Sequence, residues 1–237
     1  MTHMEQRVAI ITGGSQGIGC GLVTGYRQQG WAVVANSRRI KPSGDPDVLS
    51  VKGDITAPRT ANRIIESALE RFGRIDTLVN NAGIFISKPF TEYSAADYAS
   101  VVGVNLTGFF TLTQCAIAEM VKRRAGHIVN ITSTLVDYAN SDVPSALTSL
   151  TKGGLAAVTR SLAIEYASCG IRVNAVSPGV IQTPLHPCGS YDTLAGRQPL
   201  GRVGQVSDIV DGILFLESST FITGEILHID GGQIAGH

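Results

Sequence analysis

Short runs of β-branched and other apolar residues alternate along the chain with longer segments in which apolar residues recur at the helical period. No Pro/Ser-rich linker and no internal repeat interrupts this alternation, which predicts a single domain over residues 1–237. Helices are predicted near residues 17–29, 58–72, 94–123, 147–168 and 206–217. The predicted strands are Arg7–Thr12, Ala32–Asn36, Val48–Lys52, Thr77–Asn80, His127–Thr132, Arg172–Val176 and Ile226–Ile229.

Alternating strands and helices favour a parallel sheet, because a parallel pair needs a crossover long enough to contain a helix. We therefore expect an α/β fold with one doubly wound, Rossmann-like domain: a seven-stranded, mostly parallel sheet with helices on both faces. Ligands of such sheets bind beyond the carboxyl ends of the strands, where the strand order reverses. The residues that follow each predicted strand are therefore the first candidates for a site.

The amino-acid composition limits the kinds of partner that the protein is expected to bind. Lysine plus arginine equals aspartate plus glutamate at 19 each, so the net charge favours neither nucleic acid nor an anionic membrane. No apolar run reaches the roughly 18 residues of a membrane span, and the polar segment Met1–Gln6 resembles no signal peptide. Neither the five histidines nor the four cysteines have the spacing of metal ligands, so we expect a reduced cytoplasmic protein without a metal site. The cysteines are Cys20, Cys115, Cys169 and Cys188.

A glycine-rich turn follows the first predicted strand, with the spacing G-xxx-G-x-G in the segment Thr12–Gly19. Glycine permits positive φ and a close approach of the backbone to a pyrophosphate, and the following helix offers unpaired N–H groups and a positive dipole end. The segment predicts a dinucleotide-phosphate site, and the alternative is a glycine-rich turn without a ligand. The predicted contacts are Gly13, Ser15, Gln16, Gly17, Ile18 and Gly19.

The end of the second predicted strand bears on the choice of coenzyme. Sites for NAD usually place an acidic residue about 20 residues beyond the glycine loop, but this strand leads into Ser37, Arg38 and Arg39. A guanidinium can pair bidentately with a 2′-phosphate and a serine can add a hydrogen bond, so NADP(H) is preferred and NAD(H) stays open. The alternative is a solvated arginine pair. Asp54, after the third strand, suits the adenine amino group or an ordinary turn.

Further motifs follow in order: Asn80-Asn81-Ala82-Gly83, Asn105, Ser133, Lys152, Pro178-Gly179 with Thr183, and Ile222-Thr223-Gly224 before Asp230-Gly231-Gly232. With the glycine loop, they make the chain resemble the short-chain dehydrogenase/reductase family over nearly its whole length. That resemblance implies a small-molecule substrate and hydride transfer between NAD(P) and a carbonyl or alcohol, commonly in a homotetramer. The coenzyme contacts that it implies are Asp54, Ile55, Asn81, Ala82, Gly83, Lys152, Pro178, Gly179, Ile181 and Thr183.

The resemblance also implies a catalytic set. In the family a serine orients the carbonyl, a tyrosine donates the proton, a lysine four residues later holds the nicotinamide ribose, and an asparagine binds a relay water. Ser133, Lys152 and Asn105 match three of these positions, while Thr148 stands where the family has tyrosine. An aliphatic hydroxyl is a far poorer acid than a phenol of pKa about 10. Ordinary ketone reduction is therefore expected to be slow or absent.

Three explanations for Thr148 stay open. The residue is an engineered change in an ordinary reductase, or Tyr138 or His186 replaces the missing donor. Otherwise the protein acts on a substrate that needs little acid help, such as a protonated imine, or binds coenzyme without turnover. A catalytically silent coenzyme-binding protein, acting through binding or assembly, is therefore the alternative function.

Two further expectations concern the substrate and the assembly. Residues 184–201 are rich in Pro, Gly and Ser and match no helical period, which predicts a substrate lid. The predicted helices 94–123 and 147–168 carry more apolar residues than one sheet face can cover, which predicts a homo-oligomer, a tetramer or a dimer. The lid residues expected to face the substrate are His186, Pro187, Tyr191 and Leu194.

Overall fold

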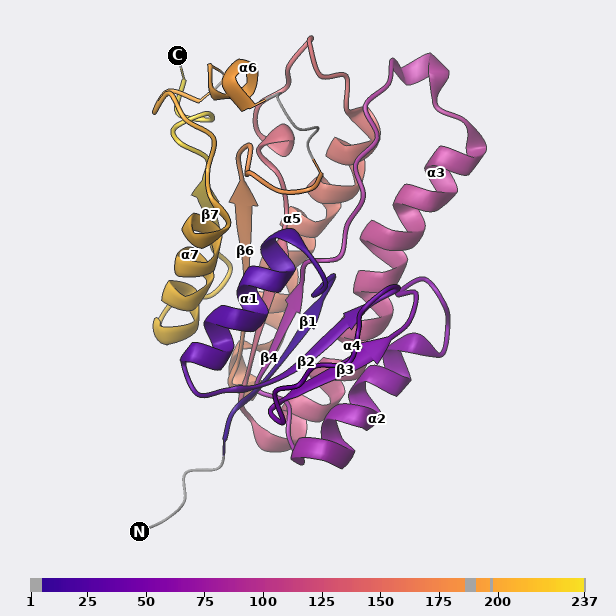
Figure 1. Cartoon of the computed structure of the whole chain (residues 1–237), viewed down its shortest axis with the longest axis vertical. Coiled ribbons are helices and arrows are strands. Elements are labelled where there is room, and N and C mark those ends of the chain that lie inside the picture. Colours follow the sequence, from indigo (N-terminus) through magenta and orange to yellow (C-terminus); the bar gives the residue numbers. More distant parts are fainter. Residues whose placement is uncertain (1–5, 186–190, 197, 237) are drawn as a thin grey trace.

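A parallel sheet forms the centre of the protein, seen here in a computed structural model that describes residues 6–185, 191–196 and 198–236 (Figure 1). Its strands are β1 (Val8–Thr12), β2 (Ala32–Ser37), β3 (Val48–Lys52), β4 (Thr77–Asn80), β5 (Gly126–Ile131), β6 (Ile171–Pro178) and β7 (Ile226–Ile229). They pair in the order β3-β2-β1-β4-β5-β6-β7, and every pairing is parallel. The expected doubly wound, seven-stranded sheet is confirmed, and among the described residues it is wholly rather than mostly parallel.

The strand sequences explain why the sheet lies inside the molecule. β1 reads VAIIT and β2 reads AVVANS, without polar alternation, as strands that are buried on both faces require. All residues of β1 and β4 are buried, so helices must cover both faces. The α-helices are α1 (Gly17–Gln28), α2 (Thr60–Phe72), α3 (Ala95–Val102), α4 (Gly108–Arg123), α5 (Ala146–Tyr166), α6 (Tyr191–Ala195) and α7 (Val206–Ser218).

Two helical layers sandwich the sheet (Figure 1). On one face, α1 and α7 pack together, and Leu22 and Ile213 join the core beneath them. On the other face, α2 and α4 contribute Ile64 and Leu112 to a second core, which also receives Ala163 of α5. The strand order reverses between β1 and β4. Crossovers leave to opposite sides of this point, which opens a crevice at the carboxyl ends of the strands.

The helix expected over residues 94–123 is confirmed as one helical stretch, Ala95–Arg123, and a π turn lies inside it. Residues Gly103–Thr107 form a π turn between α3 and α4. Next to this turn, a Cβ at Gly108 would lie 2.8 Å from the Ile55 side chain, so glycine allows the helix to approach the loop after β3. Turns of the π type often mark functional sites, and this one holds the buried Asn105.

Several element boundaries differ from the prediction by one or two residues, and part of the predicted lid is helical. β6 continues through Pro178 because that residue still pairs with Ile229 of β7, so Pro178 ends a strand rather than opening a turn. α2 begins at Thr60 rather than near residue 58. Within 184–201, α6 makes part of the predicted lid helical, while His186 and Pro187 lie outside the described residues.

One helical stretch, Ala95–Arg123, is long and apolar enough to cross a membrane by length and composition, with a mean hydropathy of 1.5. Core helices of α/β proteins meet the same criteria. This stretch contains the π turn, and its α4 part packs on β4, β5 and α2. Its apolar residues are therefore explained in part by the core under the sheet.

Candidate active site

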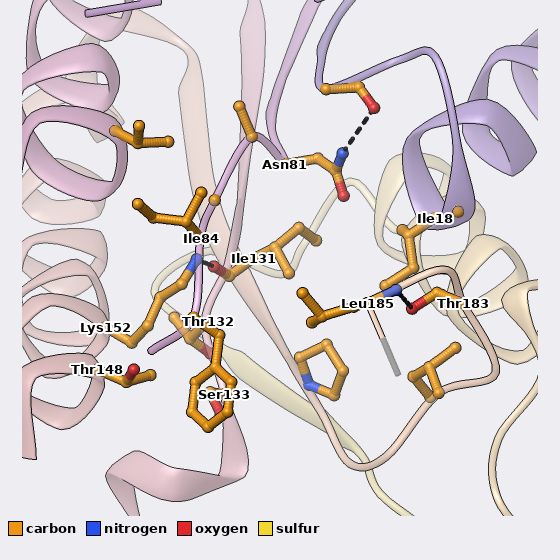
Figure 2. A pocket seen from close by; sticks show the side chains of 18 of the residues that line it. Ile18, Asn81, Ile84, Ile131, Thr132, Ser133, Thr148, Lys152, Thr183 and Leu185 are labelled. Carbon is orange, nitrogen blue, oxygen red and sulfur yellow. Dashed lines mark hydrogen bonds between the residues drawn. The ribbon is translucent and has the colours of Figure 1, made fainter. Parts of the chain in front are cut away.

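A cavity of about 680 Å³ runs along the carboxyl ends of the strands (Figure 2). Residues at the ends of β1 through β6, or directly after them, all contribute to its walls. This is the edge at which doubly wound sheets bind ligands. The residues singled out from the sequence that line the cavity are Gly13, Ser15, Gln16, Gly17, Ile18, Ser37, Arg38, Arg39, Asp54, Ile55, Asn81, Ala82, Gly83, Ser133, Thr148, Lys152, Pro178, Gly179, Ile181, Thr183 and Leu194.

The glycine loop after β1 forms one wall of the cavity. Gly13 and Gly17 have φ of 67° and 53°, a left-handed conformation that glycine adopts without steric cost. A Cβ at Gly13 would lie 2.8 Å from Asn81 Nδ2, so the loop has no room for a side chain there. Gly19 packs against the Gly13 backbone rather than lining the cavity. The N–H groups of the first turn of α1 have no partner within the helix.

Thr12 and Asn81 fasten the glycine loop to the segment after β4. Asn81 Nδ2 donates to Thr12 O at 2.8 Å. Thr12 Oγ1 accepts from the backbone N–H groups of Asn81 (3.0 Å) and Ala82 (2.9 Å). Figure 2 shows Asn81 and one of its hydrogen bonds at the cavity wall. The sequence predicted a coenzyme contact for Asn81, and the structure adds a positioning role for its amide.

The end of β2 offers polar groups to the cavity but no carboxylate. Ser37 Oγ is buried and has no hydrogen-bond partner among the described residues, and Arg38 and Arg39 beside it are exposed. The Asn36 side chain instead holds β3, since its Nδ2 donates to Val51 O at 2.9 Å. The arrangement leaves a hydroxyl donor and two guanidinium groups for a ligand at this end.

Asp54 has a local partner. Its Oδ1 accepts from the backbone N–H (2.9 Å) and the hydroxyl (2.8 Å) of Thr56. These hydrogen bonds, with a smaller attraction from Arg38, hold the pKa of the Asp54 carboxyl below its ordinary value. Asp54 therefore stabilises the turn after β3 and also lines the cavity, so the two roles weighed from the sequence are compatible.

Lys152 reaches the cavity from α5. Its side chain is only 8% exposed, and its Nζ donates to Ile131 O at 2.6 Å. Burial lowers the pKa of the Lys152 ammonium from its ordinary 10.5 to about 8. Gly83 permits this position, because a Cβ there would lie 3.2 Å from Nζ.

Thr148 and Ser133 lie beside Lys152 in Figure 2. Thr148 is one turn before Lys152 on α5, so both side chains lie on the same helix face. The Thr148 hydroxyl is buried and has no hydrogen-bond partner in the part of the chain that the structure describes. Ser133 Oγ accepts a 3.2 Å hydrogen bond from Leu135 N, and the hydroxyl proton stays available to a ligand.

Asn105 stands just behind the cavity and does not line it. Its Oδ1 accepts from Ile84 N (2.9 Å), while its Nδ2 donates to Ile84 O (3.1 Å) and to Thr151 Oγ1 (3.2 Å). Both amide protons are therefore engaged, and the side chain holds the segment after β4 against α5. The expected relay water at Asn105 stays a prediction.

The segment after β6 forms the wall next to the glycine loop, since a Cβ at Gly17 would lie 3.3 Å from the Thr183 side chain. Gly179 passes so close to Asp230 that a Cβ would lie 2.8 Å from the Asp230 Cα. Ile181 is 5% exposed and forms a bridge with Gly204. Thr183 Oγ1 accepts from Leu185 N at 3.4 Å (Figure 2). This wall is thus held by the backbone rather than by long side chains.

The remaining predicted substrate residues have different positions. Leu194 of α6 lines the cavity, whereas Tyr191 and Tyr138 are not among its lining residues. Tyr191 donates its hydroxyl to Thr183 O at 3.2 Å, which ties α6 to the wall after β6. His186 lies outside the described residues. Substrate contacts by Tyr138, His186 and Tyr191 stay predictions.

Sequence reasoning missed most of the apolar end of the cavity. Ile84, Phe85, Leu135 and Val143 line it from loops whose sequences carry no distinctive motif. Gln233 was also missed. It accepts from Thr134 Oγ1 (3.2 Å) and Gln198 Nε2 (3.1 Å), so it joins three distant parts of the chain. No local signal marks such a contact.

A doubly wound sheet, a glycine loop and a hydroxyl–lysine group at one crevice define the class of nicotinamide-dependent oxidoreductases. The sequence model of the enoyl-(acyl carrier protein) reductase family matches residues 13–233. The chain belongs to the short-chain dehydrogenase/reductase family.

Relatives and solved structures agree with this assignment. The 3-oxoacyl-[acyl-carrier-protein] reductase FabG of Thermotoga maritima is 35% identical over 250 residues, which cover 98% of this chain and 99% of that protein. The structure of ElxO with NADP bound has a TM-score of 0.90 and 32% identity, with 98% and 100% of the two chains covered. The 3-ketoacyl-(acyl-carrier-protein) reductase from Brucella melitensis, complexed with NADH, has a TM-score of 0.90 and 31% identity, covering 97% and 99%. The expected nicotinamide coenzyme is thus confirmed for structural relatives of this chain.

Proposed function

We propose that this chain is an NADP(H)-preferring oxidoreductase that transfers hydride between a nicotinamide coenzyme and a small carbonyl, alcohol or imine substrate. A single observation supports the proposal most directly: one cavity joins the glycine loop after β1 to Ser133, Thr148 and Lys152. A dinucleotide along the strand ends would span this distance. Its reactive ring would then lie beside the hydroxyl–lysine group.

The residues present fit such a coenzyme. The glycine loop has room for backbone contacts to phosphate, and the first turn of α1 offers N–H groups and a positive dipole end. The unpartnered Ser37 hydroxyl and the Arg38 guanidinium suit a 2′-phosphate. These two residues, and the lack of a carboxylate in the segment Asn36–Arg39, support the preference for NADP(H). NAD(H) remains the second coenzyme, because relatives with either form are known.

In the proposed reaction the dihydronicotinamide supplies the hydride when it is bound. Ser133 donates a hydrogen bond to the carbonyl oxygen and so orients the substrate. Lys152 holds the nicotinamide ribose and places a buried positive charge near the oxygen that becomes negative. Asn105 keeps the segment after β4 in register with α5. Thr148 occupies the position at which the family's tyrosine would donate the proton.

We also propose a homo-oligomer in the cytoplasm, a tetramer or a dimer. Phe110 on α4 and Ile164 on α5 are 61% and 79% exposed, and large exposed apolar side chains on neighbouring helices favour subunit packing. Light scattering at several protein concentrations tests the oligomeric state. A monodisperse monomer at micromolar concentration contradicts it.

The alternative is a catalytically silent coenzyme-binding protein, which the aliphatic hydroxyl of Thr148 favours. Fluorescence titration with NADPH, NADP and NADH measures binding first. Coenzyme absorbance with a panel of ketones and preformed imines then measures turnover. Reduction of any panel member with a preference for NADPH supports the oxidoreductase. Tight NADPH binding without turnover supports the silent binder, and absence of binding overturns both.

A further inference from the structure

If the chain reduces carbonyls, as proposed above, its site must supply a proton to the substrate oxygen. Four ionisable side chains are found among the described residues that line the cavity: Arg38, Arg39, Asp54 and Lys152. The first three follow β2 and β3, which lie three or more strands from β5. At about 4.8 Å per strand, that places them roughly 14 Å or more from Ser133. Lys152 is thus the ionisable group of the described lining that can reach the substrate oxygen.

Thr148 is unlike the other threonines of its helix. Thr151 and Thr159 donate their hydroxyls to the carbonyls four residues earlier, Leu147 O (3.1 Å) and Leu155 O (2.7 Å). The corresponding acceptor for Thr148 is the carbonyl of Pro144.

That acceptor already has two donors. Pro144 O accepts from Ser87 Oγ (2.8 Å) and from Lys88 N (3.1 Å), and a carbonyl oxygen has two lone pairs. The Thr148 hydroxyl therefore has no partner among residues 6–185, 191–196 and 198–236, although Thr148 is only 4% exposed. It lines the cavity, so a molecule inside the cavity can satisfy it.

We propose that Lys152 and Thr148 together are the proton donor of this site: the Lys152 ammonium supplies the proton, and the Thr148 hydroxyl, joined to it through one water, passes it to the substrate oxygen. An ammonium has three protons, and the hydrogen bond of Lys152 to Ile131 O uses one of them. The Cβ atoms of residues four apart on a helix lie about 5–6 Å from each other, so both side chains reach the same part of the cavity. General acids can act through one water.

The proton and electron balance of the step is complete. The carbonyl carbon gains a hydride from the dihydronicotinamide, which loses two electrons, and the C=O π pair moves onto oxygen. That oxygen takes the hydroxyl proton of Thr148, Thr148 takes a proton from the water, and the water takes one from Lys152. The products are an alcohol, an oxidised nicotinamide and a neutral lysine amine. Exchange with solvent then restores the ammonium.

The surroundings of Lys152 allow this step near neutral pH. Burial is the cause of its lowered pKa, and no charged side chain of the described residues adds to the shift. Three uncharged groups surround the Lys152 ammonium. They are the Ile131 carbonyl of β5, Gly83 in the loop after β4, and the Asn105 side chain of the π turn. The titratable side chains between β5 and α5 are Asp137, Tyr138 and Asp142, and none of them lines the cavity. Asp137 pairs with His228 at 3.2 Å.

The test compares near-isosteric variants of Thr148 in the full-length protein, with NADPH and the ketone that the panel shows to be reduced fastest. Thr148→Val removes the hydroxyl and keeps the shape, so kcat should fall by about 10²-fold or more. Thr148→Ser keeps a hydroxyl, so kcat should stay within about fivefold of the unmodified chain. NADPH affinity by fluorescence should be the same in all three proteins. For the unmodified chain, kcat for reduction should fall as the pH rises above about 8, where Lys152 loses its proton.

Tyr138→Phe and His186→Ala test the two other candidate donors, and each should lower kcat by much less than Thr148→Val does. Equal kcat for Thr148→Val and the unmodified chain contradicts the proposal that Lys152 and Thr148 donate the proton. A loss of turnover confined to Tyr138→Phe or His186→Ala contradicts it as well. Reduction of imines but of no ketone overturns this inference alone, whereas NADPH binding without reduction of any ketone or imine overturns the proposed oxidoreductase as well. The failure of this inference and the failure of the proposed function are therefore distinct results.

Discussion

The two ends of the sheet differ in whether their buried polar groups have hydrogen-bond partners. Three buried side-chain oxygens in the described part of the chain lack a partner, those of Ser37, Thr148 and Ser177, and all belong to the carboxyl end. At the amino end, a larger polar cluster around Glu217 is fully paired. An unpaired buried group costs about 1–3 kcal/mol. The unpaired hydroxyls therefore lower the stability of the carboxyl end, and the paired cluster at the amino end carries no such penalty.

The cluster at the amino end centres on one carboxylate. Glu217 Oε2 accepts from Thr77 Oγ1 (2.8 Å), Tyr26 OH (3.0 Å) and His127 Nδ1 (3.1 Å). Asn174 Nδ2 lies 3.1 Å from His127 Nε2. The amide donates there, so the imidazole is neutral with its proton on Nδ1.

Arg172 extends the same cluster to the end of α7. Its guanidinium donates to the carbonyls of Leu216 (2.8 Å), Glu217 (3.1 Å), Ser219 (3.2 Å) and Ile222 (3.2 Å). These are carbonyls at and beyond the end of a helix, which otherwise lack donors. Buried polar residues therefore do not by themselves mark a ligand site. Their lack of partners is the more useful sign.

The largest effect is expected at the carboxyl end. Thr148→Tyr places a phenol, a far better acid, one helical turn before Lys152 and should raise kcat for ketone reduction by about 10²- to 10⁴-fold. Coenzyme absorbance measures the rate, with Thr148→Phe as the control that adds a ring without a hydroxyl. If Thr148→Tyr brings no gain while NADPH still binds, the substrate part of the cavity has diverged as well.

At the amino end, Glu217→Ala should lower the free energy of unfolding by about 3–5 kcal/mol. It removes the acceptor of three buried donors and leaves Arg172 without a nearby carboxylate. Urea denaturation followed by circular dichroism measures the change. Glu66→Ala, at an exposed position of α2, should stay within about 0.5 kcal/mol. Similar losses in both variants would contradict the structural role of this cluster.

Arg38→Leu should weaken NADPH binding by about 10- to 100-fold, the equivalent of one charge-assisted hydrogen-bond pair of about 1.5–3 kcal/mol. Binding of NADH, which has no 2′-phosphate, should be unchanged. Fluorescence titration with both coenzymes gives the ratio, and Arg71→Leu on α2 is the matched surface control. An equal loss for NADPH and NADH would assign Arg38 to general electrostatics rather than to the 2′-phosphate.

Acid should weaken the amino end. Burial lowers the pKa of His127 in the folded protein, so the unfolded chain takes up a proton first as the pH falls below about 6.5, and stability drops by at most about 1.4 kcal/mol per pH unit. Burial raises the pKa of the Glu217 carboxyl, but its hydrogen bonds, of which that from His127 is the strongest, lower the pKa by a larger amount. The pKa of Glu217 therefore lies below its ordinary value. Its contribution is therefore present above about pH 4.5 and is lost below. Urea midpoints from pH 8 to pH 4 measure this, and His127→Gln should flatten the upper part of the curve.

The smallest expected effect comes from comparing an unpaired hydroxyl at the carboxyl end, that of Ser37, with a paired hydroxyl at the amino end, that of Tyr26. Ser37→Ala removes a buried hydroxyl that has no partner and should raise the free energy of unfolding by up to about 1 kcal/mol. Tyr26→Phe removes a hydroxyl that donates to a carboxylate and should lower it by about 1.5–3 kcal/mol. Thermal denaturation of both variants gives the two signs. A loss of stability for Ser37→Ala would mean that the Ser37 hydroxyl is already paired.

Much of the carboxyl end could be predicted from the sequence because its residues follow strands. The glycine loop and Ser37 directly follow or end a strand, and parallel strands bring such positions to one edge. Lys152 and Thr148 were also predictable as neighbours, because residues four apart share a helix face. By contrast, Gln233 reaches the cavity through partners about 35 and 99 residues away. No local pattern contains that information.

The sequence by itself determined the order of strands and helices, the parallel sheet and the edge that carries the cavity, because period and turn chemistry are local properties. Only the tertiary structure decided which buried polar groups find partners. Ser87 and Lys88 donate to the carbonyl that Thr148 would otherwise use, and Glu217 accepts hydrogen bonds from three different elements. Partners of this kind come from segments far apart in the chain, and packing alone brings them together.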